Sequence, residues 1–197
     1  MGLEKQGARP TGLIGIIIGR LMNRFHTSMY TDYFNTKDIS DKFRILDIGC
    51  GGGKFLKYLS QRSDGFYLWG IDHSKEMIDL STKLNNEDVK KGRLKLLCGS
   101  VSKIEIENNS IDLATAFETI QFWPDIDTAF SEIFRILDKG GRFLIINRYP
   151  KEGTKWWNLA NIKSEKDYKT KLEIAGFIDI SIDLHFKNGW IIVEGVK

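Results

Sequence analysis

Short apolar runs alternate with amphipathic stretches along the chain from residue 43 onward. Five of these runs are nearly continuous in branched aliphatic and aromatic residues, as the buried strands of a parallel sheet are. They span residues 43–48, 66–71, 93–98, 111–117 and 142–147. The segments between them carry apolar residues three and four apart, which predicts helices over residues 53–62, 74–86 and 125–141. Gly140 and Gly141 predict the end of the last helix. The alternation predicts one α/β domain with a doubly wound, mostly parallel sheet.

The periodicity changes toward the end of the chain. Residues 164–175 predict a helix that Ser164 caps and Gly176 ends. Residues 177–186 then alternate apolar and polar positions with a period of two, and 190–195 are again typical of a strand. The Asn-Gly pair at 188–189 is typical of a tight hairpin. The sheet is therefore expected to have about seven strands and to close with an antiparallel hairpin strand.

The segment before the first strand is expected to form a cap on this domain. Residues 11–42 predict a helix followed by a loop, which would fold over the carboxyl end of the first strand. This gives an N-terminal helical cap or lid over residues 1–42 and a main domain over residues 43–197. The apolar run 11–22 is far shorter than the ~20 residues that span a bilayer, and no A-x-A-like cleavage site follows it. We therefore expect no membrane partner.

Composition narrows the partners and the compartment. The chain has 197 residues, enough for one well-packed domain, and 29 basic residues stand against 26 acidic ones. This balance is not that of a nucleic-acid-binding surface, so we expect no nucleic-acid partner. Only Cys50 and Cys98 are present, both within apolar segments. A disulfide framework is not indicated, and a reducing, cytoplasmic location is the simpler expectation.

The stretch "DIGCGGG", residues 47–53, places four glycines at the first strand-to-helix turn. In open parallel sheets this turn usually anchors a ligand beyond the carboxyl ends of the strands. Glycines there allow positive φ, and they let backbone N–H groups approach a ligand that a Cβ would push away. The turn is therefore the expected ligand site.

Two phosphate-binding patterns fail at this turn. A P-loop needs a glycine five residues before Gly53, where Ile48 stands, and a hydroxyl after Lys54, where Phe55 stands. A dinucleotide fingerprint that starts at Gly49 needs its third glycine where Lys54 stands. The second failure disfavours an NAD(P)-dependent oxidoreductase, which remains the alternative enzyme class.

The turn instead carries the pattern Asp47-x-Gly49-x-Gly51-x-Gly53, and Asp72 ends the following strand in "WGIDHS". The pattern resembles the first motif of class I S-adenosylmethionine-dependent methyltransferases. In that family the acid that ends the second strand holds both ribose hydroxyls. The physical chemistry agrees, because an ionised carboxylate that accepts two O–H donors makes hydrogen bonds of roughly 1.5–3 kcal/mol each.

The resemblance extends over residues 44–147. Residues 112–147 look like the fourth strand, its helix and the fifth strand of the small-molecule branch of the family, the Methyltransferase type 11 or UbiE-like group. The R-x-L-x-x-G-G stretch at 135–141 is especially typical. The resemblance implies a single Rossmann-like sheet, a methyltransferase activity (EC 2.1.1.-), S-adenosyl-L-methionine as cofactor and S-adenosyl-L-homocysteine as product.

The resemblance also implies a set of cofactor contacts. Ser100 departs from the family, whose members commonly carry an acid there for the adenine amino group, and this lowers the expected affinity. Val101 would offer its backbone N–H to the adenine ring. The implied contacts are Asp47, Gly49, Cys50, Gly51, Gly53, Asp72, His73, Met77, Gly99, Ser100, Val101 and Phe117.

Some of these residues have structural alternatives. Asp72 could cap a helix, Cys50 could simply fill space, and His73 could lie in solvent at a helix start. A thiol at a helix N-terminus has a lowered pKa, but the space-filling role of Cys50 is favoured over that of a nucleophile. The three histidines lack metal-ligand spacing, so we expect no metal.

Methyl transfer from a sulfonium is an in-line displacement that mainly requires alignment of the two reactants, so no catalytic dyad need be visible. An oxygen acceptor of high pKa would want a base. The candidates are Glu118 after the fourth strand and His26 and Tyr30, four residues apart on one helical face. Each has a structural alternative, a local hydrogen bond for Glu118 and packing of the cap for the other two.

The acceptor is expected to be a small molecule. Phe117 and the aromatic residues at 122, 123, 156 and 157 could wall its site or belong to the core. The stretch "AFETIQFW" is not the [DN]-P-P-[YF] loop of nucleobase amino-methyltransferases, and the chain has no Pro-Cys pair. The acceptor atom stays open, as does the choice between monomer and homodimer. A module that binds S-adenosylmethionine without catalysis is the remaining alternative.

Overall fold

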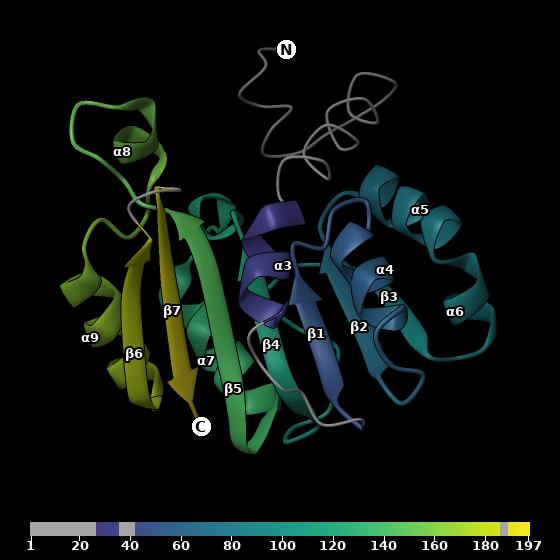
Figure 1. Cartoon of the computed structure of the whole chain (residues 1–197). Coiled ribbons are helices and arrows are strands. Elements are labelled where there is room, and N and C mark those ends of the chain that lie inside the picture. Colours follow the sequence, from purple (N-terminus) through teal and green to yellow (C-terminus); the bar gives the residue numbers. More distant parts are fainter. Residues whose placement is uncertain (1–26, 36–41, 186–188) are drawn as a thin grey trace. The chain divides into compact units, whose positions relative to one another are not determined.

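A computed structural model describes residues 27–35, 42–185 and 189–197. The seven strands of this part of the chain belong to one mixed sheet (Figure 1). The chain divides into two compact units, residues 1–100 and 101–197. Each unit has its own core and its own candidate chemistry, so each is described by itself.

The first unit is built on three parallel strands in the order β3-β2-β1. Helices α4 and α5 pack on β2, and α5 also contacts β3. Its elements are α3 (Thr27–Asn35), β1 (Arg44–Ile48), α4 (Lys54–Ser60), β2 (Tyr67–Asp72), α5 (Lys75–Leu84), α6 (Asn86–Lys90) and β3 (Leu94–Cys98). Asp72 lies opposite Cys98 in the register, so the carboxyl ends of β2 and β3 meet at the same edge.

The core of this unit explains why β2 contains a glycine. A Cβ on Gly70 would lie 2.6 Å from Cδ1 of Leu56 and 2.9 Å from Sγ of Cys50. Glycine at this position lets α4 and the turn before it sit directly on the strand. The apolar face of α4 buries Phe55, Leu56 and Leu59.

Helix α3 packs on α4 through aromatic rings. Tyr30 lies with its ring centroid 4.9 Å from that of Phe55 and 5.2 Å from that of Tyr58. Phe34 also contacts Phe55, at 5.2 Å. Tilted aromatic pairs at these separations add to the apolar burial that holds a short helix in place.

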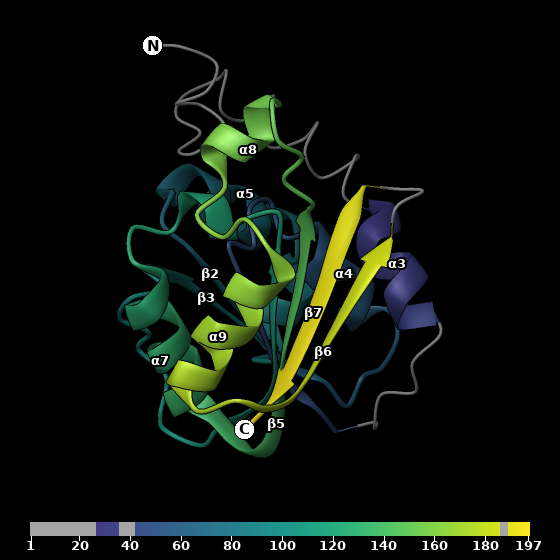
Figure 2. The same cartoon turned by 90° about the vertical axis from the view of Figure 1, so that its left-hand side faces the viewer.

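The second unit has four strands in the order β4-β5-β7-β6. β4 and β5 are parallel, whereas β7 is antiparallel to both of its neighbours, β5 and β6. Helices α7 and α9 pack on each other beside these strands, and α8 lies beyond the carboxyl end of β5 (Figure 2). The elements are β4 (Ile111–Phe117), the 3-10 turn η1 (Ile120–Phe122), α7 (Ile126–Ile136), β5 (Leu137–Arg148), α8 (Lys155–Leu159), α9 (Glu165–Ala175), β6 (Ile178–His185) and β7 (Trp190–Val196).

The predicted strands and the antiparallel ending of the sheet are confirmed. The Ser164 side chain accepts a hydrogen bond from the Asp167 N–H at 3.2 Å, which confirms the predicted cap of α9. Gly176 ends this helix with φ +103°, also as predicted. The first residues of the predicted tight turn, 186–188, lie outside the described residues, as do residues 1–26 of the predicted cap.

One predicted boundary is wrong. The helix over 125–141 was expected to stop at Gly140 and Gly141, but α7 ends at Ile136 and β5 begins at Leu137. The register between β4 and β5 jumps from Ile111–Leu137 to Leu113–Arg142, so both glycines form an irregularity within the strand. Gly140 adopts φ +77° there, and a Cβ on Gly141 would lie 2.8 Å from the carbonyl oxygen of Asp138. The glycine pair therefore bends a strand instead of stopping a helix.

Candidate functional site

The turn between β1 and α4 folds back onto the end of β2. The N–H groups of Gly49 and Cys50 donate to the carbonyl of Ile71, at 2.8 and 3.1 Å. Gly51 and Gly53 adopt φ of +49° and +75°. Residues with a Cβ enter this left-handed region at a cost of roughly 1–2 kcal/mol. The predicted positive φ of the turn is confirmed, and the fold of this turn depends on glycine.

Gly53 has a packing role. A Cβ there would lie 2.1 Å from Oγ of Ser81, in α5, and 2.6 Å from Nδ2 of Asn85, which caps the end of that helix. The buried Asn85 amide donates to the carbonyl of Gly53 at 3.1 Å and to that of Ser81 at 3.0 Å. Gly53 therefore allows the turn and the end of α5 to touch, and nothing could replace its hydrogen atom without moving one of them.

Gly51 has the opposite environment. A Cβ built there meets no atom within 4 Å, so the space above this residue is open. Its N–H donates to Oδ2 of Asp72 at 2.9 Å, which fixes the turn beside the acid that ends β2. An open cradle of bare backbone next to a buried carboxylate fits the ribose and methionine portions of S-adenosylmethionine, which present hydroxyl donors and a carboxylate group.

Asp72 joins three segments of the first unit. Its second oxygen, Oδ1, accepts the N–H of Ser74 at 2.9 Å, at the start of α5. The cap of that helix is Ser74 itself, whose hydroxyl accepts the Met77 N–H. Asp72 therefore supports the helix start without being its cap residue. Each carboxylate oxygen can accept two hydrogen bonds, so both retain capacity for a ligand hydroxyl.

Burial raises the pKa of Asp72, and the backbone N–H groups of Ser74 and Gly51 oppose this shift. The side chain is 8% exposed, and the half-exposed His73 lies with Nδ1 3.8 Å from Oδ1. A carboxylate held this way, by main-chain donors and without an Arg or Lys partner in any contact found among the described residues, keeps its charge available to a ligand.

Three further predicted contacts of the first unit, Cys50, Met77 and Asp47, are buried. Burial raises the pKa of the Cys50 thiol, and the charges of Asp72 and Asp47 raise it further. Cys50 is therefore a protonated, space-filling thiol, not a nucleophile. Met77 is buried in α5, and Asp47 is buried in β1.

Gly99 and Ser100 follow β3 at the same edge of the first unit. The Gly99 N–H donates to the carbonyl of Asp72 at 3.0 Å. Ser100 is exposed. Together with Gly51 and Asp72, these residues form the part of the predicted cofactor site that lies within one unit.

The remaining predicted residues belong to the second unit. Val101 is buried, and Phe117 is half-buried at the end of β4. Glu118 follows Phe117 and adopts φ +53°, a conformation that non-glycine residues rarely hold without support. The support comes from hydrogen bonds: its N–H donates to the carbonyl of Ile146 at 3.0 Å, and its own carbonyl accepts Nε2 of Gln121 at 2.7 Å.

The carboxylate of Glu118 is engaged by one residue of the neighbouring strand. Oε1 accepts the backbone N–H of Arg148, and Oε2 lies 3.7 Å from Nε of the same arginine. Burial raises the pKa of Glu118, while the Arg148 charge and N–H lower it. These contacts favour the local structural hydrogen bond over a free base, and the proposed catalytic role stays a prediction.

The other two base candidates lie before the first strand. His26 lies outside the described residues. Tyr30 is 3% exposed, and its ring packs between those of Phe55 and Tyr58. The packing alternative therefore describes Tyr30 well.

The aromatic residues predicted to wall the acceptor site differ in burial. Trp123 is 6% exposed, packs edge-on against Phe130 and donates from Nε1 to Oγ1 of Thr119 at 3.3 Å, so it belongs to the core. Trp156 is half-buried on α8, with the guanidinium of Arg148 4.7 Å from its ring centroid. Burial favours the core alternative for Trp123.

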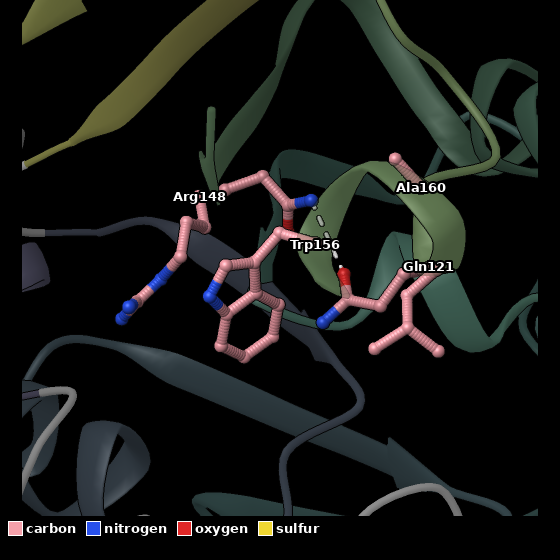
Figure 3. Close-up of a pocket in the computed structure, with 6 residues that line it drawn as sticks. Gln121, Arg148, Trp156 and Ala160 are labelled. Carbon is pink, nitrogen blue, oxygen red and sulfur yellow. Dashed lines mark hydrogen bonds between the residues drawn. The ribbon is translucent and has the colours of Figure 1, made fainter. Parts of the chain in front are cut away.

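A small pocket in the second unit escaped the sequence analysis. It is lined by Gln121, Asn147, Arg148, Trp156, Leu159 and Ala160 (Figure 3). Its residues come from η1, the end of β5 and α8, and no spacing along the chain links them. Only the ends of strands in an open sheet mark such a place in advance.

Membrane-spanning helices and metal-binding clusters were both predicted to be absent, and they are considered only for the residues that the structure describes. None of the helices described is long and apolar enough to cross a membrane. Across the same residues, no group of three or more His, Cys, Asp or Glu side chains is placed to hold a metal ion.

The family comparison bears directly on the glycine turn. The sequence profile of a family described as "Methyltransferase domain" matches residues 46–145. This range begins within β1 and ends within β5, so it includes the turn, Asp72 and Glu118. It covers half of the chain.

Curated relatives match the same region. A sterol 24-C-methyltransferase from Neurospora crassa is 29% identical over 105 residues, which are 53% of this chain and 27% of that protein. A demethylmenaquinone methyltransferase from Lactococcus lactis is 32% identical over 103 residues, 52% of this chain and 40% of that protein. The chain thus spans less than half of the length of these two relatives.

A solved structure extends the likeness in fold. The phosphoethanolamine N-methyltransferase 2 of Haemonchus contortus, in complex with phosphomonomethylethanolamine and S-adenosylhomocysteine, superposes with a TM-score of 0.73 at 19% identity. The match covers 85% of this chain and 52% of that one. At this identity the likeness concerns the fold, and it confirms the predicted Rossmann-like α/β class.

Proposed function

The chain belongs to the methyltransferase domain family, and from this premise we propose that it transfers a methyl group from S-adenosylmethionine to a small-molecule acceptor. The observation that carries the proposal is the corner formed by Gly51 and Asp72. There, open space above a bare backbone lies beside a buried carboxylate held at 2.9 Å by the Gly51 N–H. Neither a P-loop nor a dinucleotide fingerprint fits this turn.

The residues of this corner have distinct proposed roles. Asp72 accepts the two ribose hydroxyls on the lone pairs that Gly51 and Ser74 leave available. Gly49, Gly51 and Gly53 bring the backbone of the turn near the methionine portion. Asp47, Cys50, His73 and Met77 surround this corner as predicted contacts.

The adenine portion is proposed to lie at the end of β3. Ser100, exposed after the strand, offers a hydroxyl oxygen to the amino group. Gly99 leaves room at the ring, because a Cβ there would come no nearer than 3.6 Å to Cδ1 of Ile71. Val101 and Phe117 complete the predicted contacts.

Bound S-adenosylmethionine supplies a methyl group on a sulfonium, which leaves as a neutral thioether and needs no protonation. The chain therefore has to align and desolvate the acceptor more than to activate it. Glu118 is proposed as an acceptor-side residue whose carboxylate positions Arg148. His26 and Tyr30 remain proposed residues of the cap.

The domain bounds, partners, location and oligomeric state are also proposals. Residues 1–42 form the cap and residues 43–197 the methyltransferase domain. The balanced charge supports the absence of a nucleic-acid partner, and the two free cysteines support a cytoplasmic location. The chain acts as a monomer or a homodimer.

The test is transfer of a labelled methyl group from S-adenosylmethionine to acceptors of several chemical classes. A sterol, a demethylmenaquinone and phosphoethanolamine form the first set, because proteins similar to this chain are named for them. Label in an extractable product, lost in the Gly51→Val variant, supports the proposal. Tight binding of S-adenosylhomocysteine without transfer to any of a broad acceptor set would favour the non-catalytic module instead.

A further inference from the structure

The turn from Gly49 to Gly53 needs support from outside itself. Four of its five residues are glycines, which lose more conformational freedom on folding than any other residue type. Its first end is attached to β2, because the N–H groups of Gly49 and Cys50 donate to the carbonyl of Ile71. Within the turn, the Gly53 N–H donates to the carbonyl of Cys50 at 3.0 Å. The position of Gly53 therefore helps to fix the arrangement of Gly51, at the centre of the turn.

The side chain of Asn85 holds the last residue of the turn. Its Nδ2 donates to the carbonyl of Gly53 at 3.1 Å and to that of Ser81 at 3.0 Å. A carbonyl can only accept, so both contacts require the nitrogen, and the orientation of the amide is fixed. Asn85 is fully buried and caps the end of α5, so its amide links the turn to that helix.

Neither of these two carbonyls needs the amide for its own hydrogen bonding. The Gly53 carbonyl also accepts the backbone N–H of Lys57 at 3.0 Å, and the Ser81 carbonyl accepts the backbone N–H of Asn85 at 2.9 Å. The bonds from the Asn85 side chain are thus second bonds to acceptors that already have a backbone donor. What they add is a connection between the turn and α5.

This connection has a cost in stability. With Nδ2 facing the two carbonyls, Oδ1 of Asn85 is left over, and this buried atom accepts no hydrogen bond from any residue that the structure describes. The buried Oγ of Ser81 also has no partner among the same residues. Buried polar atoms without a partner destabilise a fold, so stability alone does not explain an asparagine at this position.

We propose that Asn85 is a positioning residue for the cofactor, which holds the glycine turn in its binding arrangement before S-adenosylmethionine arrives. It acts through Gly53 on Gly51, whose N–H donates to Asp72 at 2.9 Å and above which the space is open. A turn that is already ordered loses less freedom when the ligand binds, and this strengthens binding. The role rests on the proposed function, because the ligand is the cofactor of the methyl transfer.

The test removes the amide in Asn85→Ala, with Asn85→Leu as a second variant that fills the space left behind. S-adenosylhomocysteine should bind either variant about tenfold more weakly in calorimetry, because the turn then occupies its binding arrangement for only about one tenth of the time. The Gly51 N–H should therefore lose its protection from hydrogen exchange, measured by NMR, in the ligand-free variants. Saturating S-adenosylhomocysteine should restore this protection.

A first control separates positioning from a general loss of stability. Asp88, in α6, is a buried acid that contacts Arg93 and Lys57 and has no contact with the turn among those found in the described residues. Asp88→Asn should lower the melting temperature. It should leave the affinity for S-adenosylhomocysteine within about twofold of the wild-type value and keep Gly51 protected.

A second control separates the amide from the packing beside it. Ser81→Ala removes the hydroxyl that lies nearest to Gly53, and with it a buried atom without a partner, but it leaves the Asn85 amide in place. The affinity for S-adenosylhomocysteine should again stay within about twofold of the wild-type value. A loss as large as that of Asn85→Ala would mean that packing, not the amide, positions the turn, which contradicts the proposal.

Three further outcomes would overturn the role of Asn85. These are unchanged affinity in both Asn85 variants, Gly51 protection that survives in them, and an equal loss of affinity in Asp88→Asn at an equal loss of melting temperature. A wild-type chain that does not bind S-adenosylhomocysteine would instead overturn the proposed function. Exchange of the Gly51 N–H in the ligand-free proteins would then still decide whether Asn85 holds the turn.

Discussion

Two buried acids at the ends of parallel strands, Asp72 as the last residue of β2 and Glu118 just after β4, differ in what holds them. Both have pKa values raised by burial. Asp72 is held by two backbone N–H groups, each at 2.9 Å, whereas Glu118 is held by the backbone and the guanidinium of the single residue Arg148. The first arrangement leaves the negative charge for a ligand, and the second cancels it within the protein.

This difference suits Asp72 to binding a ligand and Glu118 to positioning Arg148. A carboxylate that only main-chain donors hold can add ligand hydroxyls without breaking an ion pair. A carboxylate that is paired with Arg148 would have to release a cation before it could act on a substrate. Position at a strand end alone, which both acids share, therefore does not identify the functional acid.

The largest effect is expected from a substitution that destabilises the turn beside Asp72. Gly53→Val places a Cβ against Ser81 and Asn85 and forces a branched residue to φ +75°. We expect the free energy of unfolding to fall by about 3 kcal/mol, measured by urea denaturation. A loss below about 1 kcal/mol would mean that the turn and α5 do not touch as described.

Gly51→Val is expected to act on the ligand instead. The added side chain fills open space, so S-adenosylhomocysteine should bind at least about 100-fold more weakly while the fold survives the φ strain. Gly92→Val is the control, because Gly92 also has positive φ and open space but lies between α6 and β3. If both variants bind normally in calorimetry, the cradle is misplaced.

Asp72→Asn should weaken the binding of S-adenosylhomocysteine by at least about 2 kcal/mol. The hydrogen bonds to the ribose lose their charge, and the amide nitrogen faces one of the two backbone N–H groups, of Gly51 and Ser74, that the carboxylate accepts. The wild-type affinity should also depend on pH. The pKa of Asp72 is raised above its ordinary 3.8, so affinity should fall on acidification at a pH above that of an ordinary aspartate. Calorimetry across this range should find the Asp72→Asn affinity flat, and an equal pH dependence in both proteins would contradict the assignment.

Glu118→Gln is expected to give the smallest effect on the cofactor. Affinity for S-adenosylhomocysteine should change by less than about twofold, while unfolding becomes easier by about 1 kcal/mol because Arg148 loses its charged partner. A double-mutant cycle with Arg148→Gln should show that the two losses are not additive. A large loss of turnover in Glu118→Gln that Arg148→Gln does not share would instead identify Glu118 as a base.

Much of the fold could be predicted because buried strands consist of continuous apolar runs in the sequence. The strand β4 was predicted with its exact bounds, 111–117, and the antiparallel ending followed from the period of two after Gly176. The boundary between α7 and β5 could not be predicted. Two adjacent glycines are equally suited to a helix stop and to a strand irregularity, and only the pairing with Ile111 decides between them.

The candidate site was predictable to the extent that its geometry is local. The spacing of Asp47, Gly49, Gly51 and Gly53 fixes a turn, and Asp72 follows at the next strand end. The partners of Glu118 were not predictable, since Arg148 lies 30 residues away and is placed by the pairing of β4 with β5. For the same reason the pocket of Gln121 and Asn147 had no signal in the sequence.

The central claim is that the corner of Gly51 and Asp72 holds the nucleoside of S-adenosylmethionine. Calorimetric titration of the intact chain with S-adenosylhomocysteine, and separately with NAD, tests it most directly. We predict one binding site for S-adenosylhomocysteine, weakened in Asp72→Asn, and no heat of binding with NAD. Binding of NAD alone would contradict the account and favour a nicotinamide-dependent oxidoreductase.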